Sequence, residues 1–216
     1  MSLALTRLLQ LASPALPVGA YTYSQGLEWA IEAGTVKDEA TALAWIGDQL
    51  EWNLGRYEAP LLARMMAAWQ DAATLAELDA QYLASRETAE LRAETLQMGH
   101  SLRKLIGELS EGTIVPPAAT FVAVWSALAT AWNIAPVDAL TAWLWSWAEN
   151  QTMAALKAVP LGQAGGQRIL LAIGERIPAV VERALQLDED DYSNFAPGFA
   201  IACARHETQY SRLFRS

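Results

Sequence analysis

Apolar residues recur at steps of three and four along almost the whole chain, and β-branched residues do not gather into the alternating pattern of strands. The clearest repeat lies between Arg86 and Leu109. On a helix it places these residues on one face: Leu91, Thr95, Met98, Leu102, Leu105 and Leu109. The pattern predicts an all-α fold in which this helix packs one face against a core.

Proline, glycine and capping residues divide the pattern into about ten helices, which we expect to form a single-domain bundle over residues 1–216. Pro60 should kink or divide a long helix near residues 55–59, and residues 35–38 form a predicted capping box. We expect a turn at residues 110–117. The predicted helices cover residues 3–12, a stretch ending at 33, 39–69, 75–83, 86–109, 118–132, 136–157, 167–173 and 179–187.

The most apolar predicted helix follows Pro136 and has apolar side chains almost all round it, which is typical of central burial or of an interface. The composition points the same way, because hydrophobic residues make up 53% of the chain and nine residues are tryptophan. Either the core is rich in aromatic side chains, or part of this apolar surface faces other chains. The enrichment of tryptophan at interfaces favours an oligomer or partner interface.

Residues 199–216 follow an acidic, turn-rich break and combine arginine with aromatic side chains. If residues 199–214 are helical, one face carries Phe199, Cys203, His206, Tyr210 and Leu213. Two interpretations remain open from these residues alone. The segment is either a last helix docked on its own domain, or a helix or arm that binds a partner through aromatic and arginine side chains.

The charge balance argues against a nucleic-acid partner, because the chain has a formal net charge of −9 and no basic stripe outside the short C-terminal stretch. The longest apolar stretch, residues 118–132, is too short to span a bilayer and is predicted to be a buried helix, so we expect no membrane partner. Residues 1–7 lack the pattern of a secretory signal, and a single cysteine is compatible with a reducing compartment. We therefore expect a cytoplasmic protein.

Most signatures of catalysis are missing from the sequence. No phosphate-binding Gly-x-x-x-x-Gly-Lys-Ser/Thr motif occurs, and residues 162–166 are interpreted as a tight turn. Two histidines leave little choice of a general base, and carboxylate pairs such as Glu87 and Glu90 are typical of a solvated helix face. We predict that the protein is not an enzyme and has no cofactor.

Cys203 and His206 are three residues apart and could converge on one helical face, so they are candidate metal ligands. Two ligands are too few for a closed site, and the other histidine, His100, lies on a different predicted helix. A packing role for both residues is the favoured interpretation, and a transient or intersubunit metal contact is the alternative.

Glu28 and Lys157 stand out as charged residues in apolar surroundings. Glu28 follows a turn rich in glycine and proline, and Lys157 lies at the end of the tryptophan-rich helix. The simplest interpretation of each is a solvated charge, with the lysine favourably placed near a helix C-terminus.

Three blocks of sequence together resemble the urease accessory protein UreF family. They are residues 8–28 (LLQLASPALPVGAYTYSQGLE), residues 155–163 (ALKAVPLGQ) and residues 206–216 (HETQYSRLFRS). The resemblance covers essentially the whole chain. It implies an all-helical, homodimer-forming protein that catalyses no reaction of its own and acts in the nickel-dependent maturation of urease.

The resemblance also implies the partners. A member of this family would bridge the scaffold protein UreD, also called UreH, and the GTPase UreG, and would regulate GTP-dependent nickel delivery to the urease apoprotein. Glu28 and Lys157 match family positions linked to control of the GTPase, and residues 199–216 would be the partner-docking segment. The positions matched to scaffold binding are His206, Gln209, Tyr210, Arg212, Leu213, Phe214 and Arg215. The alternative is a direct nickel-binding metallochaperone that uses Cys203 and His206.

Overall fold

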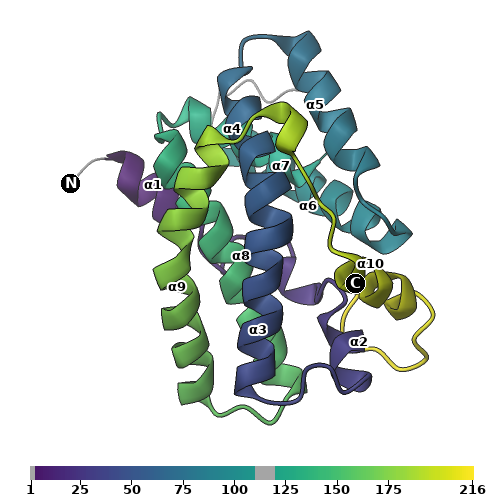
Figure 1. Ribbon diagram of the computed structural model, residues 1–216. Helices are drawn as coiled ribbons and strands as arrows, with labels where there is room; N and C mark the ends of the chain where they lie inside the picture. The colour runs from purple at the N-terminus through teal and green to yellow at the C-terminus, as the bar shows by residue number, and fades with distance from the viewer. Residues whose placement is uncertain (1–2, 110–119) are drawn as a thin grey trace.

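The computed structural model describes residues 3–109 and 120–216. Within these ranges the chain forms ten α-helices, two short 3₁₀ turns, one π-helical segment and no strand, which confirms the predicted all-α fold (Figure 1). The predicted turn at residues 110–117 lies outside the described residues. The α-helices are α1 (Leu3–Leu11), α2 (Leu27–Glu32), α3 (Glu39–Gln49), α4 (Ala59–Ala67), α5 (Ala72–Ala84), α6 (Ala89–Leu109), α7 (Phe121–Ala131), α8 (Pro136–Ala158), α9 (Gln163–Gln186) and α10 (Pro197–His206).

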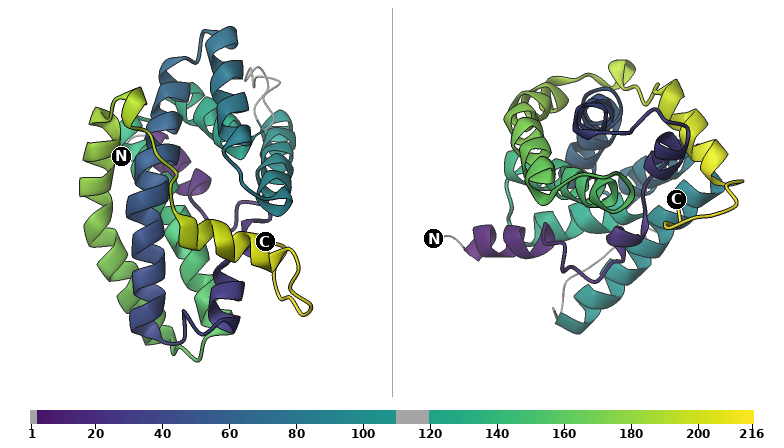
Figure 2. Two further views of the ribbon diagram at one scale, coloured as in Figure 1. Left: turned by 45° about the vertical axis from the view of Figure 1, so that its right-hand side comes forward. Right: turned by 90° about the horizontal axis from the view of Figure 1, so that it is seen from below.

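Helix α8 lies at the centre of the molecule, where α1, α2, α3, α4 and α9 pack against it (Figures 1 and 2). Leu144 is fully buried and Trp143 nearly so, and the Trp143 ring meets the Trp125 ring edge-on at 5.5 Å between centroids. Much of the tryptophan content therefore fills the core. Of the two alternatives predicted for this helix, central burial is confirmed, and the interface stays a prediction.

The long helix predicted from residue 39 is divided where proline predicts a break. Helix α3 continues into a π-helical segment, Leu50–Glu58, which leads directly into α4 with Pro60 in its first turn. Proline has no N–H, so Pro60 cannot donate to the carbonyl of Arg56 in the α-helical pattern. That carbonyl accepts a hydrogen bond from the Ser193 N–H at 3.1 Å, which ties the loop after α9 to the break.

The second predicted helix is shorter than expected because its first residues cannot be helical. Gln25 and Gly26 have φ of 51° and 74°, so α2 starts only at Leu27. The predicted capping box at residues 35–38 is also wrong. Asp38 is the N-cap of α3, and its side chain pairs reciprocally with Thr41.

The two helices predicted at residues 167–173 and 179–187 form one helix, α9, which runs through Pro178. It begins at Gln163, so the tight turn predicted at residues 162–166 is wrong. The exposed proline removes one backbone hydrogen bond, but buried side chains continue on both sides of it. Ile173, Ile177 and Val181 all pack in the main core, in a helix that contacts α8 and α3. This packing keeps the helix continuous.

The last helix ends at His206, so the condition of a helix over residues 199–214, on which the shared face of five residues depended, is not met. Phe199, Cys203 and His206 do share a buried face, whereas Tyr210 and Leu213 are exposed. The chain then turns back toward α2, where the N–H groups of Leu213 and Phe214 donate to the Glu28 carboxylate (Figure 2). Residues 207–216 are called the C-terminal segment below.

Candidate functional site

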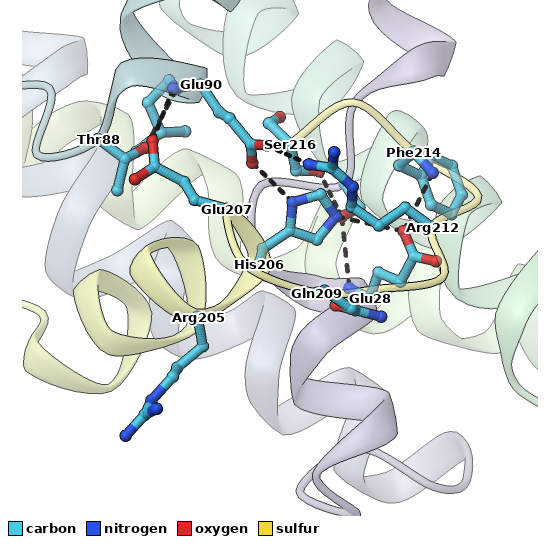
Figure 3. Close-up of polar contacts among 12 residues, drawn as sticks. Glu28, Thr88, Glu90, Arg205, His206, Glu207, Gln209, Arg212, Phe214 and Ser216 are labelled. Carbon is cyan, nitrogen blue, oxygen red and sulfur yellow. Dashed lines mark hydrogen bonds and ion pairs between the residues drawn. The ribbon is translucent and has the colours of Figure 1, made fainter.

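The imidazole of His206 is fully buried between two carboxylates (Figure 3). Its Nδ1 lies 2.7 Å from Oε2 of Glu90, and its Nε2 lies 3.3 Å from Oε2 of Glu28. A carboxylate only accepts hydrogen bonds, so both contacts are hydrogen bonds when the ring carries two protons. The histidine thus joins α10 to α6 and α2.

The carboxylate of Glu28 lies beneath the C-terminal segment. Its Oε1 accepts the N–H of Leu213 at 2.6 Å, and its Oε2 accepts the N–H of Phe214 at 3.0 Å. Only 8% of the Glu28 side chain is exposed. Glu28 therefore satisfies two consecutive backbone donors, much as a carboxylate at a helix N-terminus does.

Glu90 is the second anchor of the segment. Its Oε1 accepts a hydrogen bond from the Arg212 guanidinium at 2.5 Å, while its other oxygen faces His206. Its backbone N–H donates to Glu207 at 3.1 Å. Arg205, by contrast, points away from this network (Figure 3). Two carboxylates, one arginine and one histidine therefore close the segment onto α2 and α6.

The end of the segment is held by the turn before α2. The Ser216 carbonyl oxygen accepts the N–H groups of Ser24 and Gln25 at 2.7 Å and 2.9 Å, and Arg215 donates its N–H to the Thr22 carbonyl at 2.8 Å. The positive φ of Gln25 and Gly26 belongs to this same turn. The turn at residues 22–26 and residues 215–216 are therefore joined by backbone hydrogen bonds into one structural unit.

A buried carboxyl group, Glu94 on α6, lies behind Ser216. It accepts hydrogen bonds from the Ser216 hydroxyl and the Gln25 amide, each at 2.7 Å. Burial raises the pKa of Glu94 to about 7. Gln25 in turn accepts the indole N–H of Trp147 at 2.7 Å, so the segment is connected through Glu94 to the central helix α8.

Lys157, near the end of α8, contacts the same segment through the ring of Phe214. Its Nζ is 5.6 Å from the centroid of the Phe214 ring and 5.9 Å from that of the Tyr21 ring, within the range of cation–π attraction. Lys157 is exposed, and Phe214 is buried. The two residues that the resemblance links to GTPase control thus both contact the segment, Glu28 at the N–H groups of Leu213 and Phe214 and Lys157 at the Phe214 ring.

The remaining predicted segment residues divide between anchoring and exposure. Gln209 donates to Glu32 at 2.6 Å, whereas the Tyr210 side chain is fully exposed and Leu213 is 72% exposed. Sequence reasoning missed Glu90, which it took for a solvated helix residue, and it missed Glu94. Glu90 and Glu94 are recognised as site residues only by their contacts with residues 206, 212 and 216. Their spacing within α6 does not distinguish them from other helix residues.

A cavity of about 220 Å³ lies between the first turns of the chain and helices α6, α7 and α8. Its wall includes Gln25, Glu94 and Lys157, which the C-terminal segment also contacts. The remaining wall is mainly aromatic and aliphatic, with contributions from Tyr21, Met98, Phe121, Trp125, Trp143, Trp147 and Met153.

Cys203 and His206 do not face one another as a pair of free ligands. Both ring nitrogens of His206 face carboxylates, and the buried Cys203 lies against Gly26. Burial raises the pKa of the Cys203 thiol, which disfavours the thiolate form that binds metals. Over residues 3–109 and 120–216, no cluster of three or more His, Cys, Asp or Glu side chains is arranged to hold a metal ion.

Among the described helices, none is long and apolar enough to cross a membrane.

The model of the UreF family matches residues 36–174. The urease accessory protein UreF of Dechloromonas aromatica (strain RCB) is 58% identical over 224 residues, covering 99% of this chain and 98% of that protein. The protein of the same name from Azoarcus sp. (strain BH72) is 59% identical, covering 99% and 96% of the two chains. A third, from Methylobacillus flagellatus, is 53% identical and covers 100% and 99%.

Proposed function

Because this chain belongs to the UreF family of urease accessory proteins, we propose that it acts in urease maturation as an adaptor without catalytic activity of its own. In this role it bridges the scaffold protein UreD/UreH and the GTPase UreG, and it regulates GTP-dependent nickel delivery to the urease apoprotein. The C-terminal segment is its docking surface for the scaffold.

The exposed side of the C-terminal segment is the observation that carries this proposal. Its inner side is held by buried polar contacts, yet Tyr210 is fully exposed and Leu213 is 72% exposed. Large apolar side chains presented on a well-anchored backbone are typical of interfaces, because little conformational entropy is lost when they bind. The backbone of the segment is thus held against α2 and α6, while its exposed side chains are free to contact a partner.

Control of the GTPase is compatible with the position of Lys157. Hydrolysis of GTP responds to charges placed near the phosphates and switch loops, so one exposed lysine at the interface is enough to change its rate. Lys157 is exposed at the edge of the segment. It lacks the planar fork of arginine and is therefore proposed to act on the switch loops as a point charge.

We further propose that residues 1–216 fold as one domain, that the protein works in the cytoplasm, and that it forms a homodimer. One hydrophobic cluster extends from α1 to α9 and includes Phe214, which supports a single folding unit. Leu3, Leu5 and Leu9 on α1 are all exposed, and they offer an apolar surface to a second chain. Sedimentation analysis tests the homodimer directly.

The metallochaperone alternative receives no support from the contacts of Cys203 and His206. It still makes a separate prediction. Equilibrium dialysis of the isolated protein with nickel would show tight, stoichiometric binding that Cys203→Ala or His206→Ala abolishes. The adaptor proposal expects no tight, stoichiometric nickel binding that depends on these two residues.

Copurification with the scaffold protein tests the adaptor proposal. We expect the double variant Tyr210→Ala/Leu213→Ala to lose at least about tenfold in affinity for UreD/UreH, because both side chains are exposed anchors. The matched control is Leu171→Ala on α9, which removes a 69% exposed leucine far from the segment in sequence. Equal binding by both variants and the unaltered protein would remove the segment from the interface.

A further inference from the structure

The cavity between the first turns of the chain and helices α6, α7 and α8 reaches from solvent into the core. Among its wall residues Trp125 is 1% exposed and Trp143 is 7% exposed, whereas Tyr21 is 66% exposed and Met153 is 45% exposed. Its volume is about 220 Å³, and an apolar cavity of about 150 Å³ is enough to bind benzene. The space therefore suits a molecule somewhat larger than a single aromatic ring.

Most polar side chains of the cavity wall already have hydrogen-bond partners within the protein. Those with such partners include Gln25, Glu58, Glu94, Thr95, Trp147 and Asn150. A ligand that bonded one of these groups would have to replace an existing hydrogen bond, so little free energy would be gained. These groups give the cavity a fixed shape and leave its binding preference to other residues.

The indole N–H of Trp143 differs from these groups. The Trp143 ring lies 5.3 Å from the Phe121 ring and 5.5 Å from the Trp125 ring between centroids, and all three rings belong to the cavity wall. Its Nε1 is buried and has no hydrogen-bond partner over the described residues. An indole nitrogen can only donate, and a buried donor without an acceptor is destabilising. A molecule in the cavity that supplies an acceptor to this N–H removes that penalty.

The surroundings of the cavity favour a neutral acceptor over an anionic one. Glu94 and Glu149 both belong to the wall, and burial raises the pKa of each carboxyl group. A carboxylate that entered the cavity would lose its hydration in the same way and would lie among these acidic groups. A carbonyl oxygen accepts a hydrogen bond without the cost of burying a charge.

We propose that this cavity binds a small, neutral, mainly apolar molecule with a carbonyl group, of about the size of an aromatic ketone, and that the carbonyl oxygen accepts the indole N–H of Trp143. Trp143 then determines the preference for a carbonyl compound over a hydrocarbon of the same shape. The inference concerns the isolated chain, so its outcome and that of the proposed adaptor function are independent.

The test uses three probe molecules of similar size. Acetophenone carries a neutral carbonyl group, ethylbenzene has no acceptor, and benzoate is an anion. Each probe is titrated into the full-length chain, isotope-labelled at the tryptophan indole nitrogens, and the indole N–H signals are followed by nuclear magnetic resonance. The spectrum of Trp143→Phe identifies the signal of Trp143, because that signal is then missing.

We expect acetophenone to bind saturably and to shift the Trp143 signal. Ethylbenzene should bind at least about fivefold more weakly, because the indole N–H stays without an acceptor, and benzoate at least about tenfold more weakly. In Trp143→Phe an aromatic ring remains but the donor is gone, so acetophenone and ethylbenzene should bind within about twofold of each other. Trp52→Phe is the control, since it changes a 49% exposed tryptophan outside the wall, and it should keep the preference.

The variants Ala12→Phe and Ala15→Phe show where acetophenone binds. Ala12 is a half-buried wall residue, whereas Ala15 is exposed and does not belong to the wall. We expect Ala12→Phe to weaken acetophenone binding at least about tenfold, because the added ring occupies cavity space, and Ala15→Phe to leave it unchanged. Thermal melting establishes that both variants are folded. If Ala12→Phe is not, the comparison of Trp143→Phe with Trp52→Phe decides.

Four results would overturn the inference. Equal binding of acetophenone and ethylbenzene by the unaltered chain would show that water serves the indole N–H equally well. Tightest binding of benzoate would indicate a site for anions, with Lys157 as the exposed cation of the wall. A preference for acetophenone that persists in Trp143→Phe would exclude the role given to Trp143. Finally, the absence of saturable binding by any probe would exclude the site itself.

Discussion

At the residue scale, the buried carboxyl of Glu94 makes the stability of this fold depend on pH. Burial raises its pKa from 4.5 to about 7, so the folded state holds a proton that the unfolded chain has released between these values. Stability should therefore fall as pH rises from about 4.5 to about 7 and then level off. A shift of this size corresponds to roughly 3 kcal/mol.

The Glu94→Gln variant imitates the protonated form, because its amide can donate to Ser216 while its oxygen accepts from Gln25. We expect its free energy of unfolding, measured in urea from pH 5 to pH 8, to lack most of this decline. Glu77→Gln on the exposed face of α5 is the control and should keep the profile of the unaltered protein. A parallel decline in Glu94→Gln would show that another group is responsible.

Two arginines in ion pairs are predicted to differ widely in their effect on stability. Arg86 is 6% exposed, bonds Glu58 at 2.6 Å and stacks over the Tyr82 ring. Arg86→Met would leave the Glu58 carboxylate buried without its partner and should cost about 3–5 kcal/mol in the free energy of unfolding. Urea denaturation at neutral pH measures this loss.

Arg168→Met removes the pair with Glu39, in which the arginine side chain is 61% exposed. Solvent screens this pair, so we expect little change in stability. Similar losses in the Arg86→Met and Arg168→Met variants would contradict the importance given to burial.

Individual site residues could be predicted only through the family resemblance. Composition alone indicates that Glu28 and Lys157 are solvated charges, which is wrong for the buried Glu28, and the structure brings both to the C-terminal segment. Glu90 has ordinary helical neighbours, and its role depends on contacts with residues 206 and 212, more than a hundred positions away. Such contacts follow from the path of the chain and cannot be read from local spacing.

At the element scale, the packing of α2 against α10 depends on one glycine. Gly26 has a φ of 74°, and a Cβ there would lie 2.9 Å from the Cys203 backbone nitrogen. Gly34 has a similar φ of 75°, but a Cβ there would meet nothing within 4 Å. The two glycines therefore separate backbone strain from close packing.

Gly34→Ala should cost about 1 kcal/mol through backbone strain alone. Gly26→Ala should cost about 1–3 kcal/mol more, because the methyl group would also push α10 away from α2. Thermal melting measures both, and hydrogen exchange in residues 207–216 should increase only in Gly26→Ala. Equal losses in the two variants would show that α10 moves at little cost.

Element boundaries were predictable where local chemistry decides them and not where packing does. Pro60 marks the break before α4, since a missing N–H acts locally. Pro178 carries the same local signal, yet α9 continues through it because its buried face packs on both sides. The path of the chain after α10 also cannot be read from local rules, since Glu28 on another helix accepts the N–H groups of Leu213 and Phe214.

At the scale of the whole molecule, the turn before α2 meets the C-terminal segment, although Ser24 and Ser216 lie 192 positions apart in the sequence. The turn at residues 22–25 binds residues 215–216, and the central helix α8 joins the same place through Lys157 and Trp147. The three sequence blocks that resemble the UreF family are thus neighbours in space. The periodicity of the sequence predicts most of the helices that surround this site. The contacts between them depend on the tertiary fold and could not be predicted from the periodicity.

The nickel content of urease is the most direct test of the adaptor account. Urease apoprotein is expressed with UreD/UreH, UreG and either the unaltered chain, the Tyr210→Ala/Leu213→Ala variant or no copy of this chain, and nickel bound to the purified urease is measured by mass spectrometry. The account predicts full loading with the unaltered chain and loading near background in the other two cases. Full loading of urease in the absence of this chain would contradict it.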